Sequence, residues 1–265
     1  MLKTTSHDGT VIAYERFGQG PALVMVGGAF QVRDDAHWLT LARLLAERFT
    51  VVTYDRRGRG DSGDTGPYEV RREVEDIAAL VAELGGSALL LGMSSGAVLA
   101  LEAVQGGVPV TGLAVYEPPF VVEDSRPPLP ADYVERLRTA VAEGRRGDAV
   151  ELFLTAAVGL PAEYLGGMRA DAAGWAHMES LAHTLAYDGT VMGATMSGRP
   201  LPADRWPAVT VPTLVVDGGA SPPMFGHGAR ALAALLPAAE RRTLEGQDHQ
   251  VDPALLAGAV TEFFG

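Results

Sequence analysis

Short runs rich in valine and leucine alternate along this chain with longer segments whose apolar residues recur at helical spacing. Such alternation is typical of a mostly parallel sheet, because parallel strands need a crossover helix between them. Strands are predicted at 10–18 (hairpinned to the segment before it), 21–28, 50–55, 88–93, 112–117, 212–218 and 240–246. Helices are predicted at 37–49, 69–85, 95–107, 227–236 and 253–264. The predicted fold class is α/β, with a mostly parallel eight-stranded sheet flanked by helices.

One region interrupts this alternation. Residues 118–206 begin with "PPFVVEDSRPPLP", close with "GRPLPADRWPAV", and contain only helical patterns between these proline-rich boundaries. We therefore predict a helical insertion at 118–206, after the sixth strand, in a core domain formed by 1–117 and 207–265.

Composition excludes several classes of function. The net charge of -12 repels nucleic acid and anionic membranes, so neither is an expected partner. The absence of cysteine excludes disulfides, thiolate nucleophiles and cysteine-bound metals. The polar start "MLKTTSHDGT" does not resemble a signal peptide, and the apolar runs are too short to span a membrane. The expected location is cytoplasmic, and the oligomeric state stays open.

The stretch "GMSSG" follows a predicted strand and precedes a predicted helix. Glycines at 92 and 96 leave room for a sharp strand-to-helix turn that lifts the Ser94 hydroxyl out of the sheet. Ser94 is the candidate nucleophile. Ser95 would contribute its backbone N–H, near the helix N-terminus, to an oxyanion.

A serine nucleophile needs a base. His249 in "LEGQDHQVDP" follows the last predicted strand and should therefore emerge at the same carboxyl edge as Ser94. Its neighbour Asp248 is expected to fix the loop. Four other histidines are expected to have structural roles; they are His37, His177, His183 and His227.

The stretch "GRGDSG" at 58–63 satisfies the dinucleotide pattern G-x-G-x-x-G, but Pro67 and Tyr68 separate it from the next helix, and Asp61 would repel a phosphate. No histidine and carboxylate spacing typical of a metal site occurs. We expect neither a metal nor an organic cofactor.

With "GMSSG", "YDRRGRGDSG", "VGGAF" and "GQDH" together, the chain resembles the α/β-hydrolase family over almost its full length. The resemblance implies that 118–206 is a cap domain and that the Ala29 N–H is the second oxyanion donor. Two departures stand out. Gly27 occupies a position where many members have histidine, and Ser221 occupies the usual position of the triad acid. In some members the acid follows the preceding strand, which makes Glu117 the candidate and Asp217 the alternative.

The predicted function is a serine hydrolase that cleaves a small apolar ester or lactone through Ser94, His249 and Glu117. Serine at position 94, on the strand-to-helix turn, argues against dehalogenases and epoxide hydrolases, which need a carboxylate there. The alternatives are a non-catalytic small-molecule binder, or a lyase, cyclase or halogenating relative on the same fold. The candidate substrate-binding residues are Phe30, Trp175, Met178, Tyr187 and Met192; in the cap, these side chains could equally form the cap's own core.

Overall fold

The computed structural model describes residues 1–124 and 126–265, so Ser125 in the predicted insertion lies outside the described residues. Its centre is an eight-stranded sheet in the order β1-β2-β4-β3-β5-β6-β7-β8. Only β2 runs antiparallel to its neighbours, and all other pairs are parallel. The strands are β1 (Leu2–Thr5), β2 (Val11–Phe17), β3 (Ala22–Val26), β4 (Thr50–Tyr54), β5 (Ala88–Met93), β6 (Val110–Tyr116), β7 (Thr213–Gly218) and β8 (Ala239–Leu244). The predicted α/β class is confirmed.

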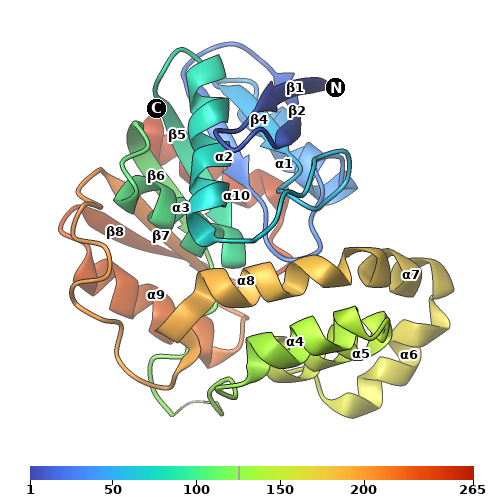
Figure 1. Ribbon diagram of the computed structural model, residues 1–265. Coiled ribbons are helices and arrows are strands. Elements are labelled where there is room, and N and C mark those ends of the chain that lie inside the picture. Colours follow the sequence, from blue (N-terminus) through green and yellow to red (C-terminus); the bar gives the residue numbers. More distant parts are fainter. Residues whose placement is uncertain (125) are drawn as a thin grey trace.

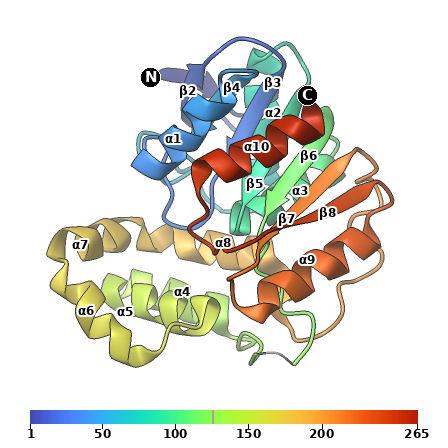
Figure 2. The same ribbon diagram turned by 180° about the vertical axis from the view of Figure 1, so that it is seen from behind.

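Helices cover both faces of this sheet. One face carries α1 (Ala36–Leu45) and α10 (Pro253–Phe264), and the other carries α2 (Val70–Glu83), α3 (Ser95–Gln105) and α9 (Pro223–Leu235) (Figures 1 and 2). Successive side chains of a strand point to opposite faces. In β3, Leu23 and Met25 accordingly pack in the cluster with α1 and α10, whereas Val24 and Val26 pack in the cluster with α2 and α3.

Local chemistry explains where several helices begin. The Asp35 carboxylate accepts the N–H of Trp38 (3.0 Å) at the start of α1, and Asp252 accepts the N–H of Ala254 (2.8 Å) at the start of α10. Proline occupies the first turn of α9 and α10, where its missing N–H costs nothing. The sequence predicted that this helix begins at residue 227. It begins at Pro223 instead, because proline fits the first turn of a helix.

A helical insertion follows β6. Figure 1 shows its helices as a layer beside the sheet, with α8 nearest to the sheet and α4 and α5 further away. Its elements are α4 (Tyr133–Ala142), α5 (Arg146–Leu152), a π-helix (Phe153–Val158), α6 (Leu165–Ala170), α7 (Ala172–Leu181), α8 (Leu185–Met192) and short 3₁₀ turns at Ala162–Tyr164, Ala182–Thr184 and Gly193–Met196. We call this insertion the cap. None of the described helices has the length and apolar composition needed to cross a lipid bilayer.

Candidate active site

The candidate nucleophile lies on a sharp turn between β5 and α3. Ser94 has φ 56° and ψ -125°, a strained backbone conformation for a residue other than glycine. A Cβ atom on Gly96 would lie 2.2 Å from the Val26 carbonyl oxygen, and one on Gly92 would lie 2.6 Å from the Ala97 Cα. Only glycine fits at both positions, which explains why the turn needs the G-x-S-x-G pattern.

A histidine and a buried carboxylate meet at the same edge. His249 lies in the loop after β8, and its Nδ1 is 2.7 Å from Oε2 of Glu117, the residue that follows β6. The other oxygen of Glu117 accepts the N–H of Gly218 (2.8 Å), and the Glu117 side chain is fully buried. Glu117 also has a positive φ of 46°. The carboxylate is therefore held by the backbone of β7 while it faces the imidazole.

Several contacts fix the loop that carries the histidine. The Tyr116 hydroxyl donates to the carbonyl of Asp248, and burial raises the pKa of Tyr116, which keeps this donor protonated. Asp248 also accepts the N–H of Gln250 (2.8 Å) through its side chain. A Cβ on Gly218 would lie 2.4 Å from the Gln247 carbonyl, so the loop passes directly over the end of β7.

The alternative acid has a different partner. Both oxygens of Asp217 lie 2.8 Å from nitrogens of Arg241 in β8, in a bidentate ion pair. Ser221, at the position where the resembling family usually has its acid, has a buried hydroxyl without a hydrogen-bond partner among the described residues. Of the residues considered as the acid, Glu117 is the one in contact with His249.

The loop after β3 lies against Ser94. A Cβ on Gly28 would be 3.0 Å from the Ser94 Cβ, and the Gly28 N–H donates to the side chain of Gln31 (2.9 Å). The backbone N–H of Ala29, the next residue, and that of Ser95 remain the predicted oxyanion donors. Among the described residues no hydrogen bond joins the Ser94 hydroxyl to His249, a contact that in many enzymes tightens only with substrate.

Beneath this loop lies a buried charge cluster that the sequence did not reveal. Asp188, from α8 of the cap, accepts hydrogen bonds from Arg56 (2.6 Å), Arg59 (2.7 Å) and the Ser95 hydroxyl (2.7 Å). Arg56 also forms a bidentate pair with Glu73 (2.6 and 2.7 Å). All five side chains are at most 4% exposed. The two arginines come from "YDRRGRGDSG", a segment in which no site residue was predicted from the sequence.

Two aromatic contacts involve His249 and the loop after β3. Phe30 packs edge-on against Phe153 of the cap's π-helix, with ring centroids 5.2 Å apart. Phe225, in the first turn of α9, stacks on the His249 ring at 5.0 Å. Phe225 and Phe153 were not among the predicted site residues, because no motif marks a residue that reaches a site only through packing.

The other predicted substrate-binding residues lie elsewhere in the cap. Trp175 and Met178 pack against the cap's own hydrophobic cluster. Tyr187 stacks on Tyr68 of the core at 3.9 Å, and Met192 is buried in the cluster between the sheet and α3. Their contribution to substrate binding stays a prediction.

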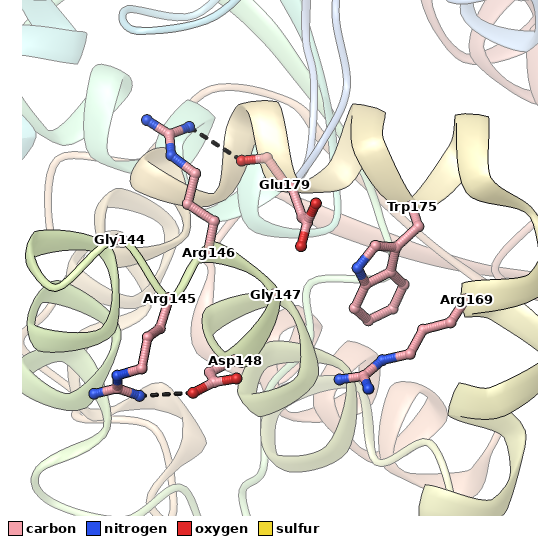
Figure 3. A pocket seen from close by; sticks show the side chains of 8 residues that line it. All are labelled: Gly144, Arg145, Arg146, Gly147, Asp148, Arg169, Trp175 and Glu179. Atoms are coloured by element: carbon pink, nitrogen blue, oxygen red, sulfur yellow. Dashed lines mark hydrogen bonds and ion pairs between the residues drawn. The ribbon is translucent and has the colours of Figure 1, made fainter.

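A groove of about 550 Å³ on the cap contains none of the triad candidates (Figure 3). Its arginines are already engaged: Arg145 pairs with Asp148 (2.7 Å), and Arg146 donates to the Glu179 carbonyl (3.1 Å). Arg169 lies over the Trp175 ring at 4.9 Å. Each of the three arginines therefore already contacts another group of the cap.

Comparisons with known proteins identify the family and the fold. The sequence profile described as "Alpha/beta hydrolase family" matches residues 23–261. The crystal structure of an alpha/beta hydrolase from Sphaerobacter thermophilus is 51% identical, with a TM-score of 0.91 and full coverage of both chains. A thermophilic esterase from Thermogutta terrifontis (23% identity, TM-score 0.69, 99% of this chain and 97% of that one) shares the fold. So does the enol-lactonase from Burkholderia xenovorans (19%, TM-score 0.71, 99% of each chain).

A curated relative matches over a shorter region. The uncharacterized hydrolase YraK of Bacillus subtilis is 37% identical over 98 residues, which is 36% of this chain and 35% of that protein. The match therefore spans about a third of either protein.

Proposed function

Because the chain belongs to the alpha/beta hydrolase family, we propose that it is a cofactor-independent serine hydrolase that cleaves a carboxylic ester or lactone. The observation that carries the proposal is the 2.7 Å contact between His249 Nδ1 and the buried Glu117 carboxylate, at the sheet edge where Ser94 occupies its strained turn. A histidine held in this way is oriented to act as base toward a serine hydroxyl.

In the proposed mechanism, the Ser94 hydroxyl attacks the substrate carbonyl while His249 Nε2 takes its proton. Glu117 keeps the proton of the imidazole on Nδ1 and stabilises the positive charge that forms on the ring. The N–H groups of Ala29 and Ser95 hold the oxyanion. His249 then protonates the leaving alcohol, and the acyl group on Ser94 is hydrolysed by a water molecule that His249 activates in turn.

The surroundings favour an apolar substrate. Phe225 stacks on the His249 ring, and Phe30, two residues after Gly28, packs against Phe153. A site with aromatic side chains gains affinity mainly from buried apolar area. Solved structures with the same fold include an esterase and an enol-lactonase, which supports ester and lactone bonds as the first substrates to test. The alternative of a non-catalytic binder was based on Ser221, which stands where the acid is usual. The contact between Glu117 and His249 weakens this alternative, because it gives the histidine a carboxylate partner.

The test combines covalent labelling with turnover. A fluorophosphonate probe should add one label per chain, and p-nitrophenyl esters and simple lactones should be hydrolysed. Ser94→Ala should abolish labelling and lower kcat by at least about 10³-fold, because the covalent route is lost.

Ser95→Ala is the comparison variant, and it should still be labelled at Ser94 with a much smaller loss of kcat. A wild-type protein that neither labels nor turns over esters would support the binder instead. Labelling without hydrolysis of any ester or lactone would favour a lyase, cyclase or halogenating relative.

A further inference from the structure

The carboxylate of Asp188 is the point where the cap meets the backbone around Ser94. It lies on α8 and is only 2% exposed. Oδ1 accepts from Arg56 and from the Ser95 hydroxyl, and Oδ2 accepts from Arg59. Burial by itself raises the pKa of Asp188, but the charges of Arg59 and Arg56 and the bond from Ser95 lower it below its ordinary value, so the group is an anion at neutral pH.

The two arginines in turn hold the loop after β3. Arg59 Nη1 donates a hydrogen bond to the Gly28 carbonyl and also approaches the Gln31 carbonyl (3.4 Å). Arg56 Nη1 donates to the Gly27 carbonyl (3.3 Å). Two consecutive carbonyl groups of the loop therefore point toward buried guanidinium groups.

The contact at the Gly28 carbonyl also determines the direction of the Ala29 N–H, which belongs to the same peptide unit. The peptide unit is planar and trans, so the Gly28 carbonyl and the Ala29 N–H point in opposite directions. When Arg59 holds the Gly28 oxygen, the Ala29 N–H is directed away from Arg59 with little rotational freedom. A Cβ built on Gly28 would lie 3.0 Å from the Ser94 Cβ, so the peptide that carries this N–H is next to the turn of the nucleophile.

The same carboxylate also holds the second proposed donor. Ser95 is the first residue of α3, and its hydroxyl donates to Asp188 (2.7 Å) while its backbone N–H belongs to the open first turn of the helix. This hydrogen bond connects the Ser95 side chain to the cap. It limits the rotation of that side chain and holds the first residue of α3 in place.

We propose that Asp188 is a positioning residue that aims both oxyanion donors, one through Arg59 and the Gly28 carbonyl and the other through the Ser95 hydroxyl. The inference rests on the proposed function, since it assigns the cap a part in the same reaction. Asp188 acts through its neighbours. The cap thereby contributes to the rate of the chemical step.

The charge of the cluster explains why the test needs a control for folding. Arg56 and Arg59 are balanced by Asp188 and Glu73, so Asp188→Asn leaves two buried cations with one buried anion and must destabilise the protein. Asp76→Asn is the matched control. Asp76 is equally buried and forms a bidentate pair with Arg57 (2.7 and 2.8 Å), whose other hydrogen bonds go to Asp8 and the Arg72 carbonyl, away from the loop after β3.

Asp188→Asn, Arg59→Lys and Asp76→Asn are compared with wild type by ester hydrolysis, thermal unfolding and binding of a boronate transition-state analogue. Loss of one oxyanion donor costs about 10² to 10³ in kcat, so misaligned donors should cost at least about tenfold. We expect Asp188→Asn and Arg59→Lys to lower kcat by that factor, with KM within about threefold of wild type. Boronate affinity should fall by the same factor as kcat.

The pH midpoints of kcat should not move in these variants, because the contact between His249 and Glu117 is untouched. Asp76→Asn should lose thermal stability and keep kcat. If Asp188→Asn fails to fold, Arg59→Lys alone tests the inference. This variant should fold, because lysine keeps a positive charge next to Asp188.

The inference is overturned if Asp188→Asn or, failing that, Arg59→Lys keeps the wild-type kcat, if the loss is confined to KM, or if Asp76→Asn loses kcat equally. A wild-type protein without labelling or ester hydrolysis would instead refute the proposed function, so the two failures are distinguishable.

Discussion

Replacing Glu117 by glutamine isolates the role of the acid, because it removes one charge at nearly constant volume. The structure also fixes how the new amide would lie. The Gly218 N–H donates to Oε1, so the glutamine carbonyl oxygen must occupy that side, and its NH₂ group must face His249 Nδ1. An NH₂ group donates to Nδ1, which forces the imidazole proton onto Nε2. In that tautomer Nε2 has no lone pair to take the proton of Ser94.

The expected loss of kcat for Glu117→Gln is about 10² to 10⁴, the larger value corresponding to a fully wrong tautomer, or about 2.7 to 5.4 kcal/mol of activation free energy. Initial rates on a p-nitrophenyl ester measure it, with circular dichroism to show that the fold is kept.

Asp217→Asn is the matched control, because Asp217 lies one residue before Gly218 but pairs with Arg241 on β8. It should leave kcat within about threefold, although it removes a partly buried ion pair. The reasoning fails if Glu117→Gln retains the wild-type kcat, or if Asp217→Asn is the more damaging of the two.

Three further predictions concern the turn, the buried cluster and the absence of a cofactor. Gly96→Ala places a Cβ 2.2 Å from the Val26 carbonyl oxygen and should lower the free energy of unfolding in urea by about 1 to 3 kcal/mol. The control Gly258→Ala lies on α10, where a Cβ would have no atom within 4 Å, and it should raise the free energy of unfolding slightly. Equal effects of the two variants would contradict the packing argument. The folded-state pKa of Asp188 is lowered, so its contribution to stability is complete above the unfolded carboxyl pKa of about 3.9 and is lost as the pH falls. Between about pH 5 and 3 the unfolding free energy of wild type should therefore fall more steeply than that of Asp188→Asn, and parallel curves would refute this. Ester hydrolysis should persist in EDTA without added nucleotide, and a strict need for a divalent cation would rule out the triad mechanism.

The parts of the fold that the sequence predicted are those set by local pattern. Apolar runs, helical spacing and glycines identified the eight-stranded α/β architecture and the turn at Ser94, because each depends on residues close together in the chain. His249 could be chosen from sequence because the carboxyl ends of parallel strands meet at one edge, and Glu117 because some members of the resembling family have their acid after the corresponding strand. Their catalytic roles stay predictions until variants are measured.

The parts that sequence did not predict depend on side-chain packing between distant segments. Asp188 and Arg56 are 132 positions apart, and nothing in the local sequence of α8 distinguishes this aspartate from a solvated one. Phe225 reaches His249 only because α9 begins at Pro223 and turns its first residues toward the loop after β8. Periodicity predicts which face of an element is buried, but it does not identify the particular side chain that lies opposite.

The two adjacent serines of "GMSSG" illustrate this difference. The positive φ of Ser94 turns its side chain out of the sheet, whereas Ser95 begins α3 and sends its hydroxyl to a buried carboxylate. Because the Ser95 oxygen is held 2.7 Å from Asp188, at a position 4% exposed, it is unavailable to a substrate and has no histidine beside it. It follows that Ser95 should not replace the nucleophile in Ser94→Ala, even though the two serines are adjacent in the chain. The Ser95 hydroxyl instead connects the start of α3 to Asp188 of the cap.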